Sequence, residues 1–336
     1  MDNESYFFTV KKPVWLDMYE TMENITGNLI CGDNVIDMSY AYSECTNITG
    51  SPVCGNNVTN MAFAYYNCTN LTGNPACGPN VTNMSSTYYN CYNLTGSPVC
   101  GNNVRDMSYA YFDCYNLTGS PACGNNVTNM ECTYYNCTNL TGSPVCGNNV
   151  VNMIDTYYNC YNLTGSPACG DNVLDMGGTY ENCTNLTGSP VCGDNVTDMA
   201  YTYVSCTNLT GSPVCGDKVT DMRDAYANCY NLTGSPACGD KVTNMYFTYF
   251  NCPNLYGDMY CNYTGSTLSS AVNMHMCFAN RNCQNRLNIH VKNGYAYHNW
   301  LMNVGTLVND TKLTYQSVGS NVLMNGATGI FIMIED

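Results

Sequence analysis

The sequence predicts an α/β repeat solenoid, and three observations support this fold class. A 23-residue unit, NITGSPVCGNNVTNMAFAYYNCT at residues 47–69, recurs in register ten times over residues 24–253 without insertion or deletion. Each unit joins a short extended stretch to a stripe of apolar residues at helical spacing. Two columns of cysteine recur at the same period. A fixed period of this size is typical of solenoids, in which each coil packs only on its neighbours.

Residues 1–23 do not match the repeat. Phe7, Phe8 and Val10 indicate a short strand, and the apolar residues at 13–16 are suited to cover the open end of the first coil. An uncapped coil exposes apolar surface and unpaired backbone groups. We therefore predict an N-terminal cap or an attachment segment to a larger assembly, and one segment can do both.

Each unit is predicted to hold one short parallel strand and one short helical segment. Residues 50–55 are extended in character and bounded by glycines, which is typical of a strand ended by turns. The apolar stripe that follows has spacings of three, four, three and three residues, which indicates successive helical turns; it consists of Val58, Met61, Tyr65, Cys68 and Leu71. One strand and one helical segment per unit is the layout of a leucine-rich repeat, here with about eleven coils.

The invariant columns predict what closes each coil. Gly50 and Gly55 recur in every full copy, which indicates backbone angles that other residues resist. The invariant Asn47 column is expected to form a buried ladder that bonds to the backbone of the next coil. The residues expected to face inward, with their equivalents in other copies, are Leu71, Cys77, Val81, Met84, Tyr88 and Cys91.

The chain contains 24 cysteines, and most of them follow the repeat. One column includes Cys31 and Cys54, and the other includes Cys45 and Cys68. Free cysteine behaves as a small apolar residue that suits a crowded interior. We therefore favour reduced ladders over disulfides, because packing requires a cysteine on every coil whereas pairing does not.

The run VTNMAFAYYNCTNLTG at residues 58–73 resembles the BspA-type leucine-rich repeat, whose pattern is roughly V-T-x-M-x-x-x-F-x-x-C-x-x-L. Tyrosine replaces the usual phenylalanine, and the resemblance covers residues 24–253. The residues that fill the pattern are Val58, Thr59, Met61, Tyr65, Cys68 and Leu71. Proteins with such repeats are bacterial surface adhesins and tail-associated proteins of gut-bacterial phages.

The resemblance implies a non-enzymatic adhesion or receptor-binding protein that recognises a glycan or protein on a host or cell surface. We expect a phage tail or other virion-surface component, with further virion proteins contacting the termini. The N-terminus lacks the regions of a secretory signal, which fits a particle released by lysis. A bacterial cell-surface adhesin, outside the cell, is the alternative.

The period breaks at residue 254. An insertion at residues 263–269 precedes a weakened helical segment at 272–278. Residues 286–291 then alternate as a strand does, and residues 329–334 are apolar and β-prone, which would be hazardous at a free sheet edge. We predict that residues 254–336 form a degenerate last coil and a β-rich C-terminal cap or docking module.

Composition argues against several functions. The net charge is −15, with ten Lys and Arg, so the basic footprint that nucleic acid requires is missing. No apolar run approaches the ~20 residues of a membrane helix, so we expect no membrane insertion. No nucleophile–base pair, nucleotide loop or paired carboxylates stand out, so we expect neither an enzyme nor a cofactor. His275, His290 and His298, with Cys277 and Cys283, match no zinc motif, so we expect no metal.

Two aspartate columns occur in the later copies. One begins at Asp171, and the other comprises Asp175, Asp198 and Asp221. Carboxylates on neighbouring coils repel each other, and calcium would relieve that repulsion. Neutral residues replace the first column in earlier copies, so we favour simple Asx turns over a calcium site.

The columns that vary predict the recognition surface. The column of Phe63 and the column of Tyr66 change from copy to copy, so these side chains are not needed to close the coil. Many of them are aromatic, and exposed aromatic rows are common recognition surfaces. Drift on a solvated face, with tyrosine as filler, is the alternative. The predicted contact row is Tyr66, Tyr89, Phe112, Tyr135 and Tyr158.

Ice or crystal-surface binding is a second functional class. Outward threonines at coil spacing would suit a flat layer of ordered water; they are Thr49, Thr72, Thr95 and Thr118. We expect Pro52, the variable aromatic residues and the net charge to interrupt such a plane.

Overall fold

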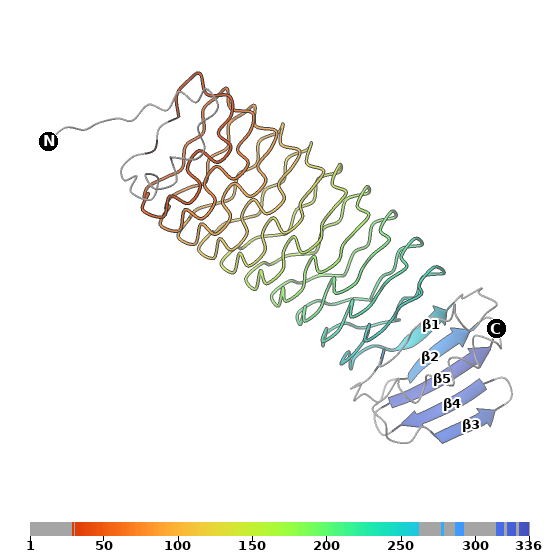
Figure 1. Cartoon of the computed structure of the whole chain (residues 1–336). Coiled ribbons are helices and arrows are strands. Elements are labelled where there is room, and N and C mark those ends of the chain that lie inside the picture. Colours follow the sequence, from red (N-terminus) through yellow and green to blue (C-terminus); the bar gives the residue numbers. More distant parts are fainter. Residues whose placement is uncertain are drawn as a thin grey trace. The chain divides into compact units, whose positions relative to one another are not determined.

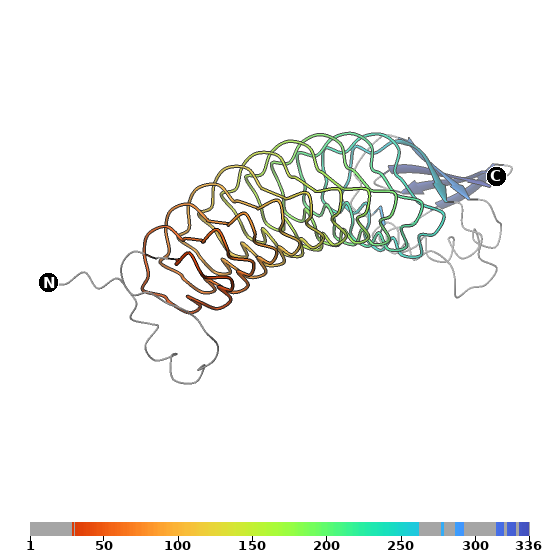
Figure 2. The same cartoon turned by 90° about the horizontal axis from the view of Figure 1, so that it is seen from above.

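The structure is a computed structural model that describes residue 29 and residues 31–261, 277–278, 286–291, 314–318, 321–326 and 329–335. The chain divides into two compact units, Met1–Leu163 and Thr164–Asp336. The predicted N-terminal cap or attachment segment, residues 1–23, lies outside the described residues. The regular 23-residue repeat is confirmed, with about eleven repeats in the chain. Within each unit the coils lie one on the next (Figure 1), and seen from above successive coils repeat the same outline (Figure 2).

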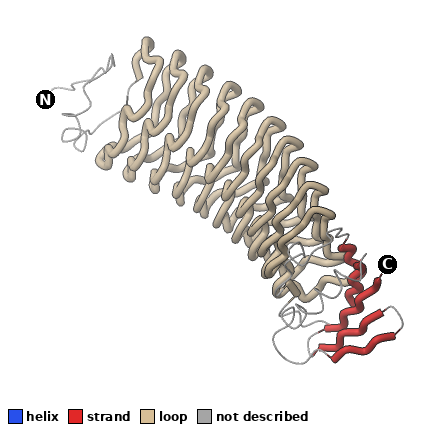
Figure 3. The backbone as a smooth tube through the Cα atoms, turned by 45° about the vertical axis from the view of Figure 1, so that its right-hand side comes forward, coloured by secondary structure: helices blue, strands red, loops and turns tan. Residues whose placement is uncertain are grey.

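Each coil is built from short turns. The N–H groups of Ala64 and Cys68 donate to the carbonyls three residues earlier, those of Met61 (2.9 Å) and Tyr65 (3.1 Å). No helix occurs in the described residues of either unit, whose repeats appear as loops and turns in Figure 3. The predicted helical segment is therefore wrong. The spacing of three and four residues is instead produced by consecutive turns that each return one side chain to the interior.

Residues with positive φ prevent the turns from merging into a helix. Phe63 has a φ of 56° and Asn67 a φ of 57°, and their equivalents share this conformation in all ten coils. Left-handed backbone costs roughly 1–2 kcal/mol for a non-glycine residue. It also turns alternate N–H groups toward the next coil, where Phe63 donates to Ser85 O (3.0 Å) and Asn67 to Tyr89 O (2.8 Å). These bonds between coils offset the cost.

The predicted strand at residues 50–55 is also wrong. The described coils have no strand or bridge at residues 51–55, so no parallel sheet runs through the Cys54 column. The isolated parallel bridges lie at the equivalents of Asn60 instead. In the first unit they join Asp37, Asn60, Asn83, Asp106, Asn129 and Asn152, and in the second unit Asp175, Asp198, Asp221 and Asn244.

The extended stretch is held by a tyrosine of its own coil. The Tyr65 hydroxyl donates to Val53 O (2.7 Å) and accepts a hydrogen bond from Val53 N–H (3.0 Å). Tyr65 is fully buried, and its ring stacks on that of Tyr88 in the next coil with centroids 5.4 Å apart. The invariant tyrosine therefore closes the coil with its hydroxyl and joins neighbouring coils with its ring.

The predicted core is confirmed with one exception. The interior side chains have no exposed area; in one coil they are Leu71, Val81, Met84, Tyr88 and Cys91. Cys77 is only half-buried, so its column lines the wall of the coil rather than the interior. The thiol of Cys91 donates to Tyr65 O (3.1 Å) in the preceding coil. The described cysteines of both columns are free thiols.

Glycine is required for a different reason in each of the two invariant glycine columns. Gly73, an equivalent of Gly50, has a φ of 82°, as the sequence predicted. Gly78, an equivalent of Gly55, is needed for close approach, because a Cβ there would lie 2.6 Å from Gly55 O and 2.9 Å from Cys54 Sγ. The column therefore sets the separation of neighbouring coils.

The Asn47 column bonds to backbone, but not as predicted. Asn70 Nδ2 donates to Thr46 O (2.8 Å) and Asn93 Nδ2 to Thr69 O (2.9 Å), which are in the preceding coil rather than the next one. These side chains are exposed rather than buried. A buried site is unnecessary because the acceptor carbonyls lie at the coil surface.

The second unit ends in a five-stranded sheet of order β1-β2-β5-β4-β3 (Figure 1). Its strands are β1 (Gly257–Cys261), β2 (Arg286–Val291), β3 (Thr314–Val318), β4 (Asn321–Gly326) and β5 (Gly329–Glu335). Strands β1, β2 and β5 are parallel, whereas β4 is antiparallel to β5 and to β3. The two predicted strands, residues 286–291 and 329–334, are thus present, and β5 is protected on both edges.

Two described parts of the degenerate last coil, residues 254–261 and 277–278, pack on the last full coil. Leu255 forms a parallel bridge with Gly234 and is buried. The ring of Phe278 stacks on that of Tyr249, with centroids 5.4 Å apart, and takes the next place in the tyrosine ladder after the inserted segment. Most of the segment predicted at 272–278 lies outside the described residues. In the part of the chain that the structure describes, no helix has the length and apolar character to cross a membrane.

Candidate binding surface

The five residues of the predicted contact row, called the aromatic row below, form one continuous stack in the first unit. The ring centroids of Tyr66 and Tyr89 are 4.8 Å apart, and those of Tyr89 and Phe112 are 4.6 Å apart. Phe112 and Tyr135 follow at 4.5 Å, and Tyr135 and Tyr158 at 4.4 Å. Neighbouring planes are within 17° of parallel. The structure therefore brings all five residues together.

The turn that positions the row is the same in every coil. Phe63, in the left-handed conformation, accepts a hydrogen bond at its carbonyl from Tyr66 N–H (3.3 Å). Phe63 N–H in turn donates to the next coil, so each turn is fixed relative to its neighbour. Equivalent side chains leave successive coils in the same direction, and an aromatic residue in five consecutive coils must stack.

The aromatic row exposes ring edges. Its members are half-buried. Tyr89, Phe112 and Tyr135 each have a ring on both faces, at 4.4–4.8 Å, so their exposed area lies along the edges and at the hydroxyl ends. The tyrosines of the core ladder stack with centroids 5.3–5.6 Å apart, so the surface row is the more closely stacked of the two.

A second set of rings lies beside the row. Tyr40 and Phe63 stack at 4.7 Å, and Phe63 packs tilted against Tyr66 at 5.6 Å. Tyr109 packs tilted against Phe112 at 5.9 Å. This column is variable in sequence but was not predicted to be part of the site. The signal was available, since Phe63 and Tyr109 each precede a row member by three residues, one turn of the coil.

A second stacked surface pair, the half-buried Tyr92 and the exposed Tyr115, was missed altogether. Their rings stack at 5.4 Å in another column, where other copies carry threonine. Burial, together with the charge and hydrogen bonding of the Asp113 carboxylate, raises the pKa of the Tyr115 phenol to about 12. Because threonine is accepted at this position, the pair serves as an internal comparison for the aromatic row.

Carboxylates surround the row. The Tyr109 hydroxyl donates to Glu131 Oε1 (2.8 Å), and this hydrogen bond is the main cause of the raised pKa of Tyr109. Burial raises the pKa of Tyr89, and the charges of Tyr66 and Asp113 add to the effect. Burial likewise raises the pKa of Tyr135, with contributions from Tyr158 and Asp155. The phenols of Tyr89, Tyr109 and Tyr135 therefore remain protonated at neutral pH.

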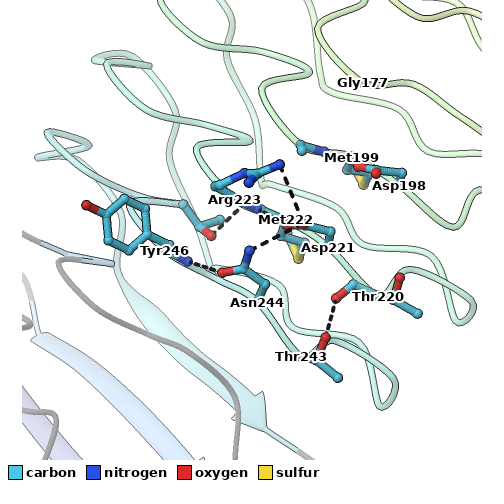
Figure 4. A network of polar contacts seen from close by, with 12 residues as sticks. Gly177, Asp198, Met199, Thr220, Asp221, Met222, Arg223, Thr243, Asn244 and Tyr246 are labelled. Carbon is cyan, nitrogen blue, oxygen red and sulfur yellow. Dashed lines mark hydrogen bonds and ion pairs between the residues drawn. The ribbon is translucent and has the colours of Figure 1, made fainter.

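The second unit does not continue the aromatic row. The equivalent positions carry Glu181, Val204, Ala227 and Phe250. A polar cluster occupies part of this face instead (Figure 4). The Arg223 guanidinium lies 5.2 Å from the centre of the Tyr201 ring and 3.8 Å from Asp221 Oδ2.

The column of Asp175, Asp198 and Asp221 forms the predicted Asx turns. Asp221 Oδ1 accepts a hydrogen bond from Arg223 N–H (2.8 Å), and Asp198 Oδ1 accepts one from Ala200 N–H (2.8 Å). Asn244 Nδ2 donates to the other oxygen of Asp221 (3.3 Å) in Figure 4. Among the described residues, no group of three or more His, Cys, Asp or Glu is placed to hold a metal ion. The side chains of the three histidines lie outside the described residues.

The threonine row is exposed, but its hydroxyls bond to backbone. Thr72 Oγ accepts a hydrogen bond from Gly50 N–H (3.2 Å), and Thr118 Oγ donates to Gly96 O (3.4 Å). These bonds account for the recurrence of threonine without any ligand. Pro52 is buried, so the expectation that it would interrupt this face is wrong.

No protein-family model, curated protein or solved structure matches this chain.

Proposed function

We propose that this protein is a non-enzymatic binding protein that recognises a host-surface glycan or protein through the aromatic row. The observation that carries the proposal is the stack of five surface rings in consecutive coils of one unit. Tyrosine gives a large contact area and a hydroxyl at low entropic cost. A rigid, repeating scaffold holds such rings in place before the ligand arrives, which lowers the cost of binding.

Aromatic residues are not required at these positions. The chain carries Ser43, Glu181, Val204 and Ala227 at equivalent places, and those coils form the same turns. Packing alone therefore gives no reason for five aromatic residues in succession. A selected surface accounts for the run better than drift does, because drift would scatter the rings over both units.

We also propose that the repeats form a solenoid related to the BspA-type leucine-rich repeat, in which turns replace the usual helical segment. The interior places of the pattern, such as Met61 and Tyr65, are buried. On this basis the protein is a phage tail or other virion-surface component that contacts further virion proteins through its termini. A bacterial cell-surface adhesin is the alternative. Neighbouring tail and lysis genes, or secretion and wall-sorting genes, distinguish the two.

The test is binding of the labelled full chain to candidate host cells, measured by flow cytometry. The variant replaces all five residues of the aromatic row by serine, the residue that the chain itself has at position 43. A stacked aromatic pair contributes about 0.5–1.5 kcal/mol beyond its buried area. The variant must therefore show the circular dichroism spectrum of the wild type at the assay temperature.

The matched control replaces Tyr92 and Tyr115 by threonine, which occurs at the equivalent position in other copies. This change also removes a stacked surface pair. We expect the control to bind cells like the wild type and the row variant to lose binding. A wild type that binds no host, or a row variant that binds undiminished, would exclude this function for the row.

A further inference from the structure

We infer that the aromatic row binds an extended, uncharged glycan edge-on, through hydrogen bonds from its phenol hydroxyls, and not by stacking sugars on ring faces. The inference rests on the proposed function and specifies its ligand. Tyrosine rings in sugar-binding sites can contribute either a face or an edge. The geometry of the row leaves ring edges, and not ring faces, available to a ligand.

The faces of the inner rings are already covered. A sugar between two rings needs a van der Waals contact of about 3.5–4.0 Å on each side, hence rings about 7–8 Å apart. The rings of Tyr89, Phe112 and Tyr135 are separated by 4.6 and 4.5 Å. Their outer neighbours, Tyr66 and Tyr158, lie at 4.8 and 4.4 Å. A ligand therefore meets ring edges and hydroxyl groups along most of the row.

The hydroxyls have a definite pattern. Tyr66 and Tyr89 supply one pair of hydroxyls, Tyr135 and Tyr158 supply another pair that is hydrogen-bonded within itself, and Phe112 leaves a gap between the pairs. A hydroxyl that takes part in one hydrogen bond keeps capacity for another. The Tyr109 hydroxyl beside the gap is engaged with Glu131 and so does not fill it. The row thus offers hydrogen-bonding groups on either side of an apolar edge. Sugar chains present hydroxyls and C–H groups alternately in the same way.

The charge of the surface selects an uncharged chain. Arg105 is the single Lys or Arg in the sequence of residues 31–163. The same range contains seven acidic residues, namely Asp33, Asp37, Glu44, Asp106, Asp113, Glu131 and Asp155. Asp113 follows Phe112 directly in the sequence. Glu131 accepts a hydrogen bond from the hydroxyl of Tyr109, whose ring packs against Phe112. Carboxylates so near the row repel uronic acid, sialic acid and sulfated sugars.

The regular spacing selects a long ligand. The row repeats every 4.4–4.8 Å along the stack. A polymer with hydrogen-bonding groups on every unit meets several hydroxyls at once, and each contact after the first is intramolecular. The irregular surface of a globular protein rarely presents identical groups at so short a regular interval. The geometry therefore favours a glycan chain lying along the row over a protein partner.

The experiment removes hydroxyls while keeping rings. In one variant Tyr66, Tyr89, Tyr135 and Tyr158 are replaced by phenylalanine, as Phe112 already is in this row. The probes are immobilised linear hexasaccharides of glucose, mannose and N-acetylglucosamine, with a hyaluronan hexasaccharide as the anionic comparison. Affinities of the full chain are measured by biolayer interferometry, and the serine variant of the row is measured in parallel.

We expect the wild type to bind at least one neutral hexasaccharide more tightly than its disaccharide, and hyaluronan weakly or not at all. The phenylalanine variant should bind at least about tenfold more weakly, the loss expected for two or three net hydrogen bonds. Phe112→Tyr, which fills the gap with a fifth hydroxyl, should change affinity for the same sugar, whereas Tyr115→Phe outside the row should not.

The outcomes separate the two proposals. If serine abolishes binding but phenylalanine leaves it intact, the row is the site and edge-on hydroxyl binding is wrong. If both variants bind like the wild type, the site itself is elsewhere. Binding to hyaluronan alone would overturn the neutral class. Binding to host cells that survives removal of their glycans would overturn the glycan in favour of a protein receptor.

Discussion

Replacing Tyr111 by phenylalanine tests the tyrosine that closes each coil. The Tyr111 hydroxyl donates to Val99 O (2.8 Å) and accepts a hydrogen bond from Val99 N–H (3.1 Å). The ring is fully buried between Tyr88 and Tyr134, with centroids 5.4 and 5.5 Å away. Phenylalanine keeps this stacking, so the substitution removes the two hydrogen bonds and little else.

The magnitude follows from the two backbone groups that lose their partner. A buried polar group left unsatisfied costs about 1–3 kcal/mol. Val99 is half-buried, so water can reach one of its two groups, and we expect a total loss of about 1.5–3 kcal/mol. A substitution at an exposed tyrosine changes stability by less than about 0.5 kcal/mol. Tyr115→Phe is therefore the matched control.

Hydrogen exchange is the suitable measurement, because repeat arrays open locally rather than in one step. The Met107 amide donates to Asn129 O (3.0 Å), a bond that the substitution does not touch. Its exchange therefore reports opening of the whole coil. A loss of 1.5–3 kcal/mol corresponds to exchange faster by about ten- to a hundredfold. Exchange at Met107 within threefold of the wild type would refute the role assigned to the hydroxyl.

Two further predictions concern the core. Met130→Asp should unfold several coils, because a fully buried side chain would become an unpaired charge, and an unchanged urea unfolding curve would contradict this. The thiols should be shielded from reaction in the folded protein. Burial raises the pKa of Cys54 to about 11 and that of Cys100 to about 12, whereas the pKa of cysteine in an unfolded chain is about 8.5. The reactive thiolate is therefore scarce in the folded protein at pH 9. Iodoacetamide should label them slowly in the native state and fully in urea without reductant; mass spectrometry that finds them linked in pairs would reverse the assignment.

The repeat, the core and the contact between the five rings could be predicted because a strict period makes every copy equivalent. Once Tyr66 is placed on one coil, Tyr89 must lie beside it. This alignment of side chains can be predicted without knowing the backbone conformation inside a coil. The prediction that the five side chains form one row therefore depends on the period alone.

The internal path could not be predicted from spacing. Intervals of three and four residues between Val58, Met61 and Tyr65 suit a helix and suit consecutive turns equally well. The discriminating signal was the column of Asn67, which is asparagine in most copies. Asparagine tolerates positive φ, and its recurrence four residues after a turn argues against a continuous helix.

A signal against the predicted strand was also present. Pro52 recurs in nearly every copy, and proline has no N–H to donate to a sheet. The isolated bridges lie instead at Asn60, where each copy carries Asn or Asp. That side chain also accepts the N–H two residues later, as Asn60 Oδ1 does from Ala62 N–H (3.0 Å). The same residue thus marks the bridge and the start of the first turn.

The column of Phe63 adds aromatic rings to the recognition surface. Every coil requires positive φ at this position, and Gly178 shows that the fold accepts the residue that adopts it without strain. Phe63 and Tyr109 nevertheless occupy it, with φ of 56° each, at a cost of roughly 1–2 kcal/mol per residue. Both pack against the aromatic row, at 5.6 and 5.9 Å. These rings widen the aromatic surface beside the row, whereas the strain itself belongs to the repeat, because all ten coils have positive φ at this position.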